Sequence, residues 1–467
     1  MSRFGLPIGG ALLDSGRGEQ SDDARFDALA LTPSETLLVE ETLDQPERDL
    51  YAELERWSAR PWRNAVKREI SSVAWAKLSE TIELPIPLIM CALSYELGAE
   101  RAGVSASTAA HPAPRLWAAR YPAVYLWCRR RRRGFVVGES RRAVQALSEA
   151  LSAPLREQRS SGEHPHARAT HNPWLTQGQS LIQGELRPHM GWPAYRAALA
   201  EVRELLLSGD LYQLNFTLGM SAKLEADVSI EEVFTRLHAV NSGPFGALIN
   251  IDERRSVLSF SPERLVQWSG VSSTKSERVI KTSPIKGTRP RSADPQRDQA
   301  AREELRASEK DQAEHVMILD LERNDLGRIC ESGSVEVAVD RALCSYSTVH
   351  HLVSVVQGQL RPEASLTDIL EATFPGGSVT GAPKRRAMQA IRSLEVGPRG
   401  VYCGALGYLD PMGGGDLNLP IRTALVDGDR FTYHAGGGIV VDSTARGEWD
   451  EVWVKTQGVL KGLGVKE

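Results

Sequence analysis

Helical and extended periodicities alternate along the chain, so the sequence predicts a protein that mixes helices with strands. Residues 51–80 repeat Trp, Leu and Val at helical spacing. Residues 195–207 do so more clearly, because their leucines and valine share one face of a helix. Gly209 follows this segment, and a glycine directly after an apolar-periodic run is a common helix end.

Short apolar runs predict strands at several places. Residues 88–93 form a continuous apolar run typical of a buried strand, and residues 211–218 predict another. Residues 119–126 and 134–137 are β-rich and predict the two strands of a hairpin. After residue 191 the chain continues to alternate β-rich runs with helical segments.

One long stretch lacks an apolar period and divides the chain. Residues 154–190 are rich in Ser, Gly, Pro, His and Gln, which predicts a linker or a long surface loop. The sequence therefore predicts an N-terminal region, residues 1–153, and a C-terminal domain, residues 191–467. This division suits the length, because chains beyond roughly 250–300 residues usually split into domains.

The composition predicts a soluble, globular protein, with 41% hydrophobic and 25% charged residues. The net charge of -4 gives no electrostatic basis for binding nucleic acid. We expect no signal peptide and no membrane span, since no apolar run approaches the roughly 20 residues required. The five cysteines lie far apart, which fits a reducing cytoplasm better than a disulfide framework.

Two segments place carboxylates on one face of a predicted helix. Asp311 and Glu314 are three positions apart in the first segment. Glu448, Glu451 and Lys455 follow one another at intervals of three and four in the second. Magnesium binds one or two carboxylates and keeps several waters, so one ligand from each helix would suffice. Taken alone, either segment is equally typical of an exposed helix with ordinary charges.

Two glycine-rich stretches predict unusual backbone. Gly436, Gly437 and Gly438 lead into a β-branched pair, so we expect either a nest of N–H groups for an anion or a plain turn between strands. The segment FPGGSVTGAPK, which contains Thr380, predicts a second glycine turn. Its spacing is not that of a phosphate-binding loop, so it predicts no nucleotide site.

Lys286 and Glu263 are candidates for catalysis on local grounds. Lys286 stands between Pro-Ile and Gly, where desolvation would lower its pKa and favour a neutral, nucleophilic amine. Glu263 follows a β-rich run, a location suited to a general acid whose pKa is raised by burial. A surface lysine and a surface Glu–Arg pair are the alternatives.

The order of these segments resembles the chorismate-binding enzyme family over residues 191–460. The matching segments are SPERL, PIKGT, KDQAEHVMILDLERNDLGR, VHHLVS, FPGGSVTGAPK, GYLD followed by IRT, and AGGGIVVDS followed by EWDEVWVK. The resemblance implies an α/β (α+β) fold of two stacked antiparallel β-sheets surrounded by helices. It also implies an active site between the sheets, within a catalytic domain of residues 191–467.

The resemblance also implies a set of site residues. The implied magnesium ligands are Glu314, Glu451, Asp311 and Glu448, the last two through water. The implied catalytic residues are Lys286, Glu263 and His351. The implied substrate-binding residues are Gln213, Gly287, Thr288, Thr380, Tyr408, Arg422, Gly436, Gly437, Gly438 and Lys455.

Within this set, the two carboxylates of chorismate would meet different groups. The ring carboxylate would be held by Lys455 and the backbone at Gly287 and Thr288. The enolpyruvyl carboxylate would be held by Tyr408, by Arg422 and by the three successive glycines. Glu263 would protonate the departing C4 hydroxyl, and His351 would line the ring.

Two positions distinguish the reactions of the family. Isochorismate and salicylate synthases carry a basic lysine where this chain has Gln213, and an amide cannot activate water. Anthranilate synthases usually have Ala where Lys286 stands, whereas the family members that aminate C4 through a lysine have Pro-Ile-Lys-Gly-Thr, as here. The sequence therefore favours amination of chorismate at C4, in para-aminobenzoate and folate biosynthesis, through a covalent bond to Lys286.

The expected cofactor is Mg²⁺ and the expected substrates are chorismate and ammonia. No glutaminase signature is visible, so we expect a separate glutamine amidotransferase subunit to supply the ammonia. Three alternatives stay open. The chain could be an anthranilate synthase, which aminates C2 and eliminates pyruvate; an isochorismate or salicylate synthase; or a homologue that binds chorismate without converting it.

Overall fold

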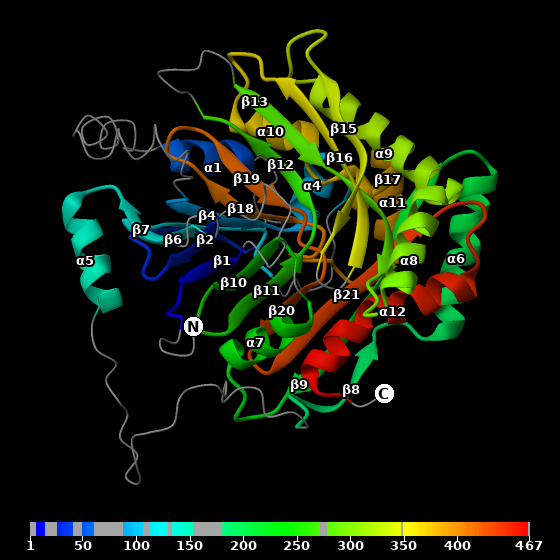
Figure 1. The fold of residues 1–467 in the computed structure, drawn as a ribbon, viewed down its shortest axis with the longest axis horizontal. Coiled ribbons are helices and arrows are strands. Elements are labelled where there is room, and N and C mark those ends of the chain that lie inside the picture. Colours follow the sequence, from blue (N-terminus) through cyan, green and yellow to red (C-terminus); the bar gives the residue numbers. More distant parts are fainter. Residues whose placement is uncertain are drawn as a thin grey trace.

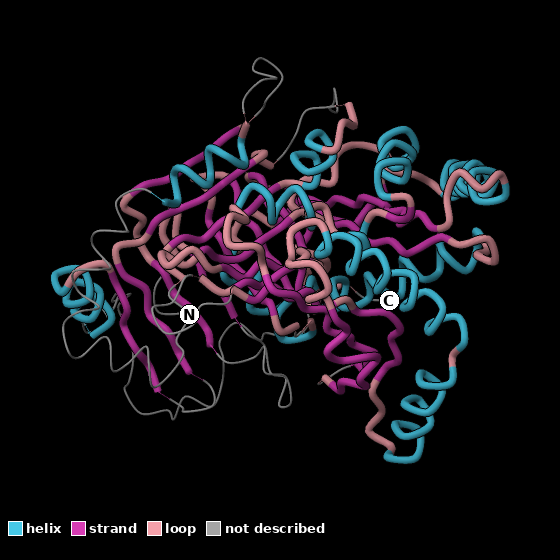
Figure 2. Tube along the Cα trace, turned by 90° about the horizontal axis from the view of Figure 1, so that it is seen from above, coloured by secondary structure: helices cyan, strands magenta, loops and turns pink. Residues whose placement is uncertain are grey.

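The computed structural model describes residues 6–14, 26–40, 49–59, 87–105, 113–128, 133–152, 179–241, 243–270, 278–346 and 349–465. Residues 154–178 of the predicted linker and residues 60–80 of the first predicted helix lie outside these ranges. The described strands form two antiparallel sheets, of eleven and ten strands. Helices lie around the sheets (Figures 1 and 2), which confirms the predicted fold class.

The first sheet has the order β17-β9-β21-β20-β11-β10-β1-β2-β6-β7, and β8 pairs with β9 outside this path. Its strands are β1 (Ala11–Asp14), β2 (Phe26–Ala30), β6 (Ala123–Cys128), β7 (Arg133–Gly138), β8 (Ile182–Pro188), β9 (Gln213–Leu224), β10 (Phe245–Asn250), β11 (Arg255–Ser261), β17 (Gly381–Ala382), β20 (Thr423–Asp427) and β21 (Arg430–Ile439).

The second sheet has the order β14-β16-β13-β12-β19-β18-β4-β5-β3, and β15 pairs with β16. Its strands are β3 (Glu35–Val39), β4 (Ile89–Leu93), β5 (Leu116–Arg120), β12 (Arg264–Trp268), β13 (Val279–Ser283), β14 (Ile285–Pro290), β15 (Glu336–Ser345), β16 (Val349–Gln359), β18 (Ala405–Leu409) and β19 (Gly415–Asn418).

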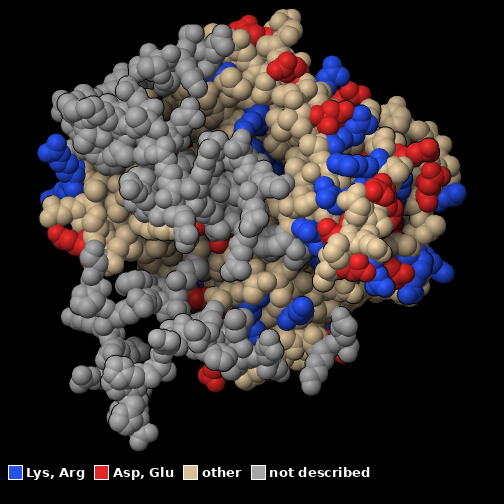
Figure 3. Space-filling model, viewed as in Figure 1, with Lys and Arg blue, Asp and Glu red and all other residues tan. Residues whose placement is uncertain are grey.

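The described helices are α1 (Leu50–Ala59), α4 (Tyr95–Arg101), α5 (Arg141–Ser152), α6 (Trp192–Leu207), α7 (Ile230–Val240), α8 (Pro295–Ala307), α9 (Glu309–Gly327), α10 (Leu366–Thr373), α11 (Lys384–Leu394) and α12 (Ala445–Leu463), with a 3-10 turn η1 at Gly377–Val379. In Figure 1, α6, α8, α9 and α12 lie on one side of the molecule and α5 lies on the opposite side. The visible surface over the α8 and α9 side carries interspersed charges of both signs (Figure 3). Within the described ranges, no helix combines the length and the hydropathy that a membrane span needs.

Both predicted regions of the chain contribute strands to both sheets. Ala11 of β1 pairs with Ile249 of β10, and Leu93 of β4 pairs with Ala405 of β18. One apolar core joins the two sheets, so the strands before residue 153 are not a separate layer. The predicted linker also contains β8, which pairs with β9 and is therefore part of the sheet.

The predicted hairpin is confirmed between β6 and β7, but the first strand begins at Ala123, later than the predicted residue 119. The structure divides residues 119–126 into β5 and β6, which belong to different sheets. Pro122 lies between them, and its missing N–H interrupts ladder pairing. The chain crosses from one sheet to the other at this point.

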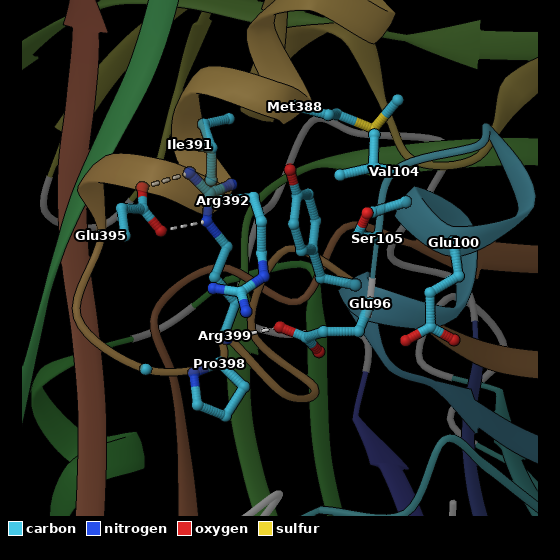
Figure 4. Close-up of a pocket in the computed structure, with 13 residues that line it drawn as sticks. Glu96, Glu100, Val104, Ser105, Met388, Ile391, Arg392, Glu395, Pro398 and Arg399 are labelled. Atoms are coloured by element: carbon cyan, nitrogen blue, oxygen red, sulfur yellow. Dashed lines mark hydrogen bonds and ion pairs between the residues drawn. The ribbon is translucent and has the colours of Figure 1, made fainter. Parts of the chain in front are cut away.

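A buried carboxylate ties the N-terminal region to the catalytic strands. Glu96 of α4 accepts hydrogen bonds from the backbone N–H of Arg399, at 2.6 Å, and from that of Gly400, at 3.2 Å. The Arg399 guanidinium donates to Glu395 at 2.6 and 2.8 Å and to the Asn215 carbonyl of β9 at 2.7 Å. Figure 4 shows Glu96 and Glu395 on either side of Arg399. This cluster stabilises β9 through the hydrogen bond to Asn215.

Replacing Glu96 with alanine should therefore weaken the fold. Two buried N–H groups would lose their acceptor, which we expect to lower the free energy of unfolding by about 2 kcal/mol or more. Urea unfolding at neutral pH measures the change. Glu371→Ala is the control, because its ion pair with Arg101 is partly exposed, with 38% of the Glu371 side chain accessible, and such pairs contribute about 0–1 kcal/mol. Equal losses in the two variants would contradict the assignment.

Candidate active site

Lys286 lies where four charged groups from three parts of the chain exert their charges: α9, α12 and the residues directly before β12. It is on β14, which packs against α9. Burial lowers the pKa of Lys286; the carboxylates of Glu314 and Glu263 act in the opposite direction, as does Glu451, whereas Lys455 lowers it. The residue as a whole is half-buried. The predicted lysine and three of the predicted carboxylates therefore share one site.

Glu263 is 5% exposed, directly before β12. Burial raises its pKa to about 7, although the Ser378 hydroxyl, the charge of Lys286 and the backbone of Ile285 each lower it. The Ser378 hydroxyl donates to Glu263 Oε1 at 2.7 Å. A carboxyl with this pKa is partly protonated at neutral pH, as a general acid must be.

Helices α9 and α12 direct their carboxylates toward one another. Ser308 caps α9 and Thr444 caps α12, which fixes where the first turns begin. Burial raises the pKa of Glu314, and the charge of Glu451 adds to that effect. A side chain at Gly437 would come within 3.1 Å of both Glu448 Oε2 and Glu451 Oε1. The two helices therefore present carboxylates to one region, as the sequence predicted.

Lysines lie beside these carboxylates. Lys455 Nζ is 2.7 Å from Glu451 Oε1 and donates to the Gly436 carbonyl at 2.8 Å, while Lys310 Nζ is 3.9 Å from Glu314. Asp311 pairs with Arg289 at 3.2 Å. Among the described residues, no three His, Cys, Asp or Glu side chains form a group with metal-binding geometry.

His351, Thr288 and Gly287 form one corner of the site. His351 Nδ1 lies 2.9 Å from the Thr288 hydroxyl and 3.3 Å from the Gly287 carbonyl. Burial lowers the pKa of His351 to about 3, so the ring is neutral near pH 7. Gly287 has a φ of 77°, and a side chain there would meet Leu305 of α8 at 2.7 Å. The Pro-Ile-Lys-Gly-Thr segment thus needs its glycine for close packing.

Arg422 lies near this corner. Its charge contributes to the low pKa of His351, and burial lowers its own pKa. Its φ is 52°, an uncommon value for a side-chain-bearing residue, and it forms no ion pair with any described residue. A partly buried cation of this kind is suited to an anionic ligand.

Tyr408 differs from the other predicted ligands. The charges that act on its phenol are those of Asp416, Asp410 and Arg264, after the dominant effect of burial, which raises its pKa. Within the described ranges, no hydrogen bond joins Tyr408 to Arg422. Its place in substrate binding remains a prediction.

The glycine run forms neither the predicted nest nor the predicted turn. Gly436, Gly437 and Gly438 lie within the extended strand β21 and pair with Thr217, Phe216 and Asn215 of β9. Glycine is required there because a side chain at Gly436 would meet the Phe216 carbonyl at 2.2 Å. At Gly437 the missing side chain leaves room for the α12 carboxylates. The run therefore clears space for charged groups and presents no N–H nest.

Gln213 and Thr380 are both fully buried. The Gln213 amide forms no hydrogen bond to a described residue, and a side chain at Gly438 would come 2.5 Å from its Nε2. The amide is thus free to meet a ligand. The Thr380 hydroxyl instead donates to the Gly376 carbonyl at 2.9 Å, which stabilises the glycine turn.

The sequence did not single out a second buried carboxyl behind Glu263. Glu322 of α9 is 5% exposed; burial, then repulsion from Asp325, raises its pKa to about 8, and Glu263 adds to this. Lys384 pairs with Asp325 at 2.6 Å. Helical periodicity predicts only an ordinary charged residue at position 322. It cannot show that other parts of the chain pack against the face of α9 that carries Glu322. The roles of Ser378 and Arg399 also depend on contacts between distant segments.

Comparisons with known proteins agree with this geometry. The model of the chorismate binding enzyme family matches residues 13–461. A 277-residue segment is 41% identical to aminodeoxychorismate synthase component 1 of Klebsiella aerogenes, covering 59% of each protein. A 275-residue segment is 38% identical to anthranilate synthase component 1 of Arthrobacter globiformis, covering 58% of this chain and 50% of that protein. The alignments thus span about half to three fifths of these relatives.

The whole fold has a counterpart among solved structures. Anthranilate synthase component I from Streptococcus pneumoniae TIGR4 superimposes with a TM-score of 0.74 at 26% identity, covering 95% of each chain. The chain therefore belongs to the chorismate binding enzyme family. Its membership extends through the N-terminal region, whose strands complete both sheets.

The charge state of Glu322 should be visible in the stability of the protein. A carboxyl with a pKa near 4.5 when unfolded and about 8 when folded binds its proton more tightly in the native state. The favourable contribution of Glu322 to the free energy of unfolding is therefore lost as pH rises from about 5 to 8. We expect Glu322→Gln to unfold at higher urea concentration than the wild type at pH 8 and to reduce this pH dependence.

Asp320→Asn is the matched control on the same helix, because 68% of the Asp320 side chain is exposed. We expect it to leave the pH dependence unchanged. Parallel curves for the wild type and Glu322→Gln between pH 5 and 9 would show that Glu322 is not a protonated carboxyl in the native state.

Proposed function

We propose that this chain aminates chorismate at C4 with ammonia, in a magnesium-dependent reaction that passes through a covalent bond to Lys286. One observation carries the proposal: burial lowers the pKa of Lys286 and raises that of Glu263, and the two groups lie within electrostatic reach of one another. Opposite shifts bring an amine and a carboxyl toward the neutral forms that a nucleophile and a general acid require.

The steps follow from these two groups. The neutral Lys286 amine adds at C2 of the ring, and the two conjugated ring double bonds shift so that the C4 hydroxyl is expelled. Glu263 gives its proton to that hydroxyl, which departs as water. Ammonia then attacks C4, the lysine leaves C2, and the proton released by the new amine returns to Glu263. Ser378, which donates to Glu263 Oε1 at 2.7 Å, orients this carboxyl.

The residues present suit a magnesium ion held jointly with substrate. Glu314 and Glu451 would bind it, with Asp311 and Glu448 nearby, and one or two protein carboxylates are enough for this cation. Bound magnesium would draw negative charge toward the ring carboxylate and favour addition at C2. The close approach of Glu448 and Glu451 to Gly437 supports such a site.

Separate cations are available for the two carboxylates of chorismate. Lys455 and the backbone at Gly287 and Thr288 would hold the ring carboxylate. Arg422, a partly buried residue with no ion pair to a described residue, suits the enolpyruvyl carboxylate. The neutral ring of His351 would line the substrate between them. Gln213 would offer an unpaired amide to the same ligand.

Ammonia would come from a glutamine amidotransferase subunit. The relative from Klebsiella aerogenes is named component 1 of its synthase, which supports a second component. On this proposal the chain would act in the cytoplasm, in para-aminobenzoate and folate biosynthesis.

The second candidate is amination at C2 with elimination of pyruvate. The relative from Arthrobacter globiformis and the superimposed Streptococcus structure, both named as anthranilate synthases, favour it. Lys286 weighs against it, because that reaction needs no covalent lysine.

Product analysis separates the candidates. We expect the wild-type protein, with chorismate, ammonia and magnesium, to form 4-amino-4-deoxychorismate. Lys286→Ala should slow that reaction about a hundredfold or more, or divert amination to C2. Lys281→Ala, in the neighbouring strand β13, is the control and should keep the wild-type rate. Liquid chromatography with mass detection identifies the product. Anthranilate as the main product of the wild type would support the second candidate.

The pH profile tests the role of Glu263. The carboxyl must be protonated, so the rate per unit of free ammonia should fall as pH rises through about 7. Deprotonation of Lys286 would raise the rate as pH rises, and this gives the acidic limb of the pH–rate profile. Glu263→Gln should lower the rate about 10²–10⁴-fold and remove the alkaline limb. An unchanged alkaline limb in this variant would assign it to another group.

A further inference from the structure

The peptide of Lys286 is bordered by a buried set of polar groups that the reaction described above does not use. His315 follows Glu314 on α9 and is fully buried. Its Nε2 lies 2.7 Å from the hydroxyl of Ser354, a fully buried residue of β16. The backbone N–H of Arg341 donates to the same hydroxyl at 2.8 Å. Three elements thus meet at one serine.

The Arg341 donor is available because β15 is irregular at this point. Arg341 has a φ of 46°, and the pairing of β15 with β16 shifts register between Val339 and Ala342. Such a bulge breaks the ladder and redirects one N–H. A left-handed conformation is unfavourable for arginine, so the hydrogen bond to Ser354 helps to retain it.

The same serine adjoins the strand that carries Lys286. The Ser354 N–H donates to the Pro284 carbonyl at 3.2 Å, and Lys286 pairs with Leu352 in the β14–β16 ladder. The second nitrogen of His315, Nδ1, is buried and has no well-formed hydrogen bond to a described residue. The Lys286 backbone is the nearby acceptor that acts on this ring.

We propose that His315 and Ser354 are positioning residues, which fix the Lys286 peptide against α9 and β16 and thereby aim its amine at the substrate. A neutral imidazole satisfies every partner at once. Ser354 accepts from Arg341 and donates to His315 Nε2, so that the Nδ1 proton faces the Lys286 carbonyl. No change of protonation at His315 takes part.

This inference rests on the proposed function, because it treats Lys286 as the nucleophile. The placement of a nucleophile affects turnover more than substrate binding, since a displacement of about 1 Å can cost up to 10²-fold in rate. Removing the Ser354 hydroxyl should therefore lower kcat and leave KM for chorismate nearly unchanged.

The experiment compares Ser354→Ala with Ser354→Thr. We expect kcat with ammonia to fall about tenfold in the alanine variant and to recover in the threonine variant, which keeps a hydroxyl. The buried Ser259, whose hydroxyl lies 2.8 Å from that of Thr423 in the other sheet, gives the control variant Ser259→Ala. It should lose comparable stability without a change in kcat.

A second readout does not depend on the reaction. Trace labelling of amines with acetic anhydride, followed by peptide mass spectrometry, measures the reactivity of Lys286 relative to other lysines. We expect Ser354→Ala to change it by about threefold or more and Ser259→Ala to leave it unchanged.

Unchanged kcat and unchanged labelling in Ser354→Ala would overturn the inference. So would equal losses in the alanine and threonine variants. If the wild type forms no C4 product, the proposed function fails, while the labelling comparison still shows whether Ser354 positions Lys286.

Discussion

The removal of the Lys286 amine from water, in the presence of carboxylates from other elements, is the constraint on which the site depends. Burial favours the neutral amine, while Glu314, Glu263 and Glu451 favour the ammonium. The net effect lowers the pKa, because desolvation is the larger influence. The same burial raises the pKa of Glu263. Burial thus shifts the amine and the acid toward the neutral forms that the proposed reaction requires.

The fold creates this buried site by bringing together helix faces and strand ends that are far apart in sequence. Helix α9 packs on β14 and β16, and α12 packs on β21. The close approach of α12 depends on strand positions without side chains, of which Gly437 is the clearest. The Arg399 cluster stabilises β9, the strand that carries Gln213, through a hydrogen bond to the Asn215 carbonyl. The N-terminal strands complete both sheets.

Periodicity and motif order predicted much of the fold and most of the candidate site. The helix faces of α9 and α12 follow from spacing alone, because residues three and four apart face the same way. The sheets' long-range pairing does not follow from spacing. Local sequence therefore predicts a linker where β8 lies, and one strand where the structure has the end of β5 and the start of β6. The glycine run was misread for a related reason. A strand glycine that makes room for a neighbour and a turn glycine have the same local sequence.

Some groups could not be predicted at all. Glu322 and Ser354 look like ordinary polar residues in the sequence. Their environment is created by other segments of the chain, such as those that carry Glu263 and Lys384 beside Glu322 and His315 beside Ser354. Burial distinguishes Glu322 from a surface carboxyl and raises its pKa; repulsion from Asp325 adds to this effect, and the charge of Lys384 opposes it. Tyr408 shows the converse, since the motif that predicts it contains Asp410 but not Asp416, which pairs with Tyr408 between β18 and β19.

The most direct test of the central claim is to trap the covalent form. The protein would be mixed with chorismate and magnesium without ammonia, quenched in acid, and analysed by intact and peptide mass spectrometry. We expect an adduct with the mass of chorismate less one water, located on the peptide that contains Lys286 and absent from Lys286→Ala. Amination at C4 by a wild-type protein that never shows this adduct, or an adduct on another residue, would contradict the account.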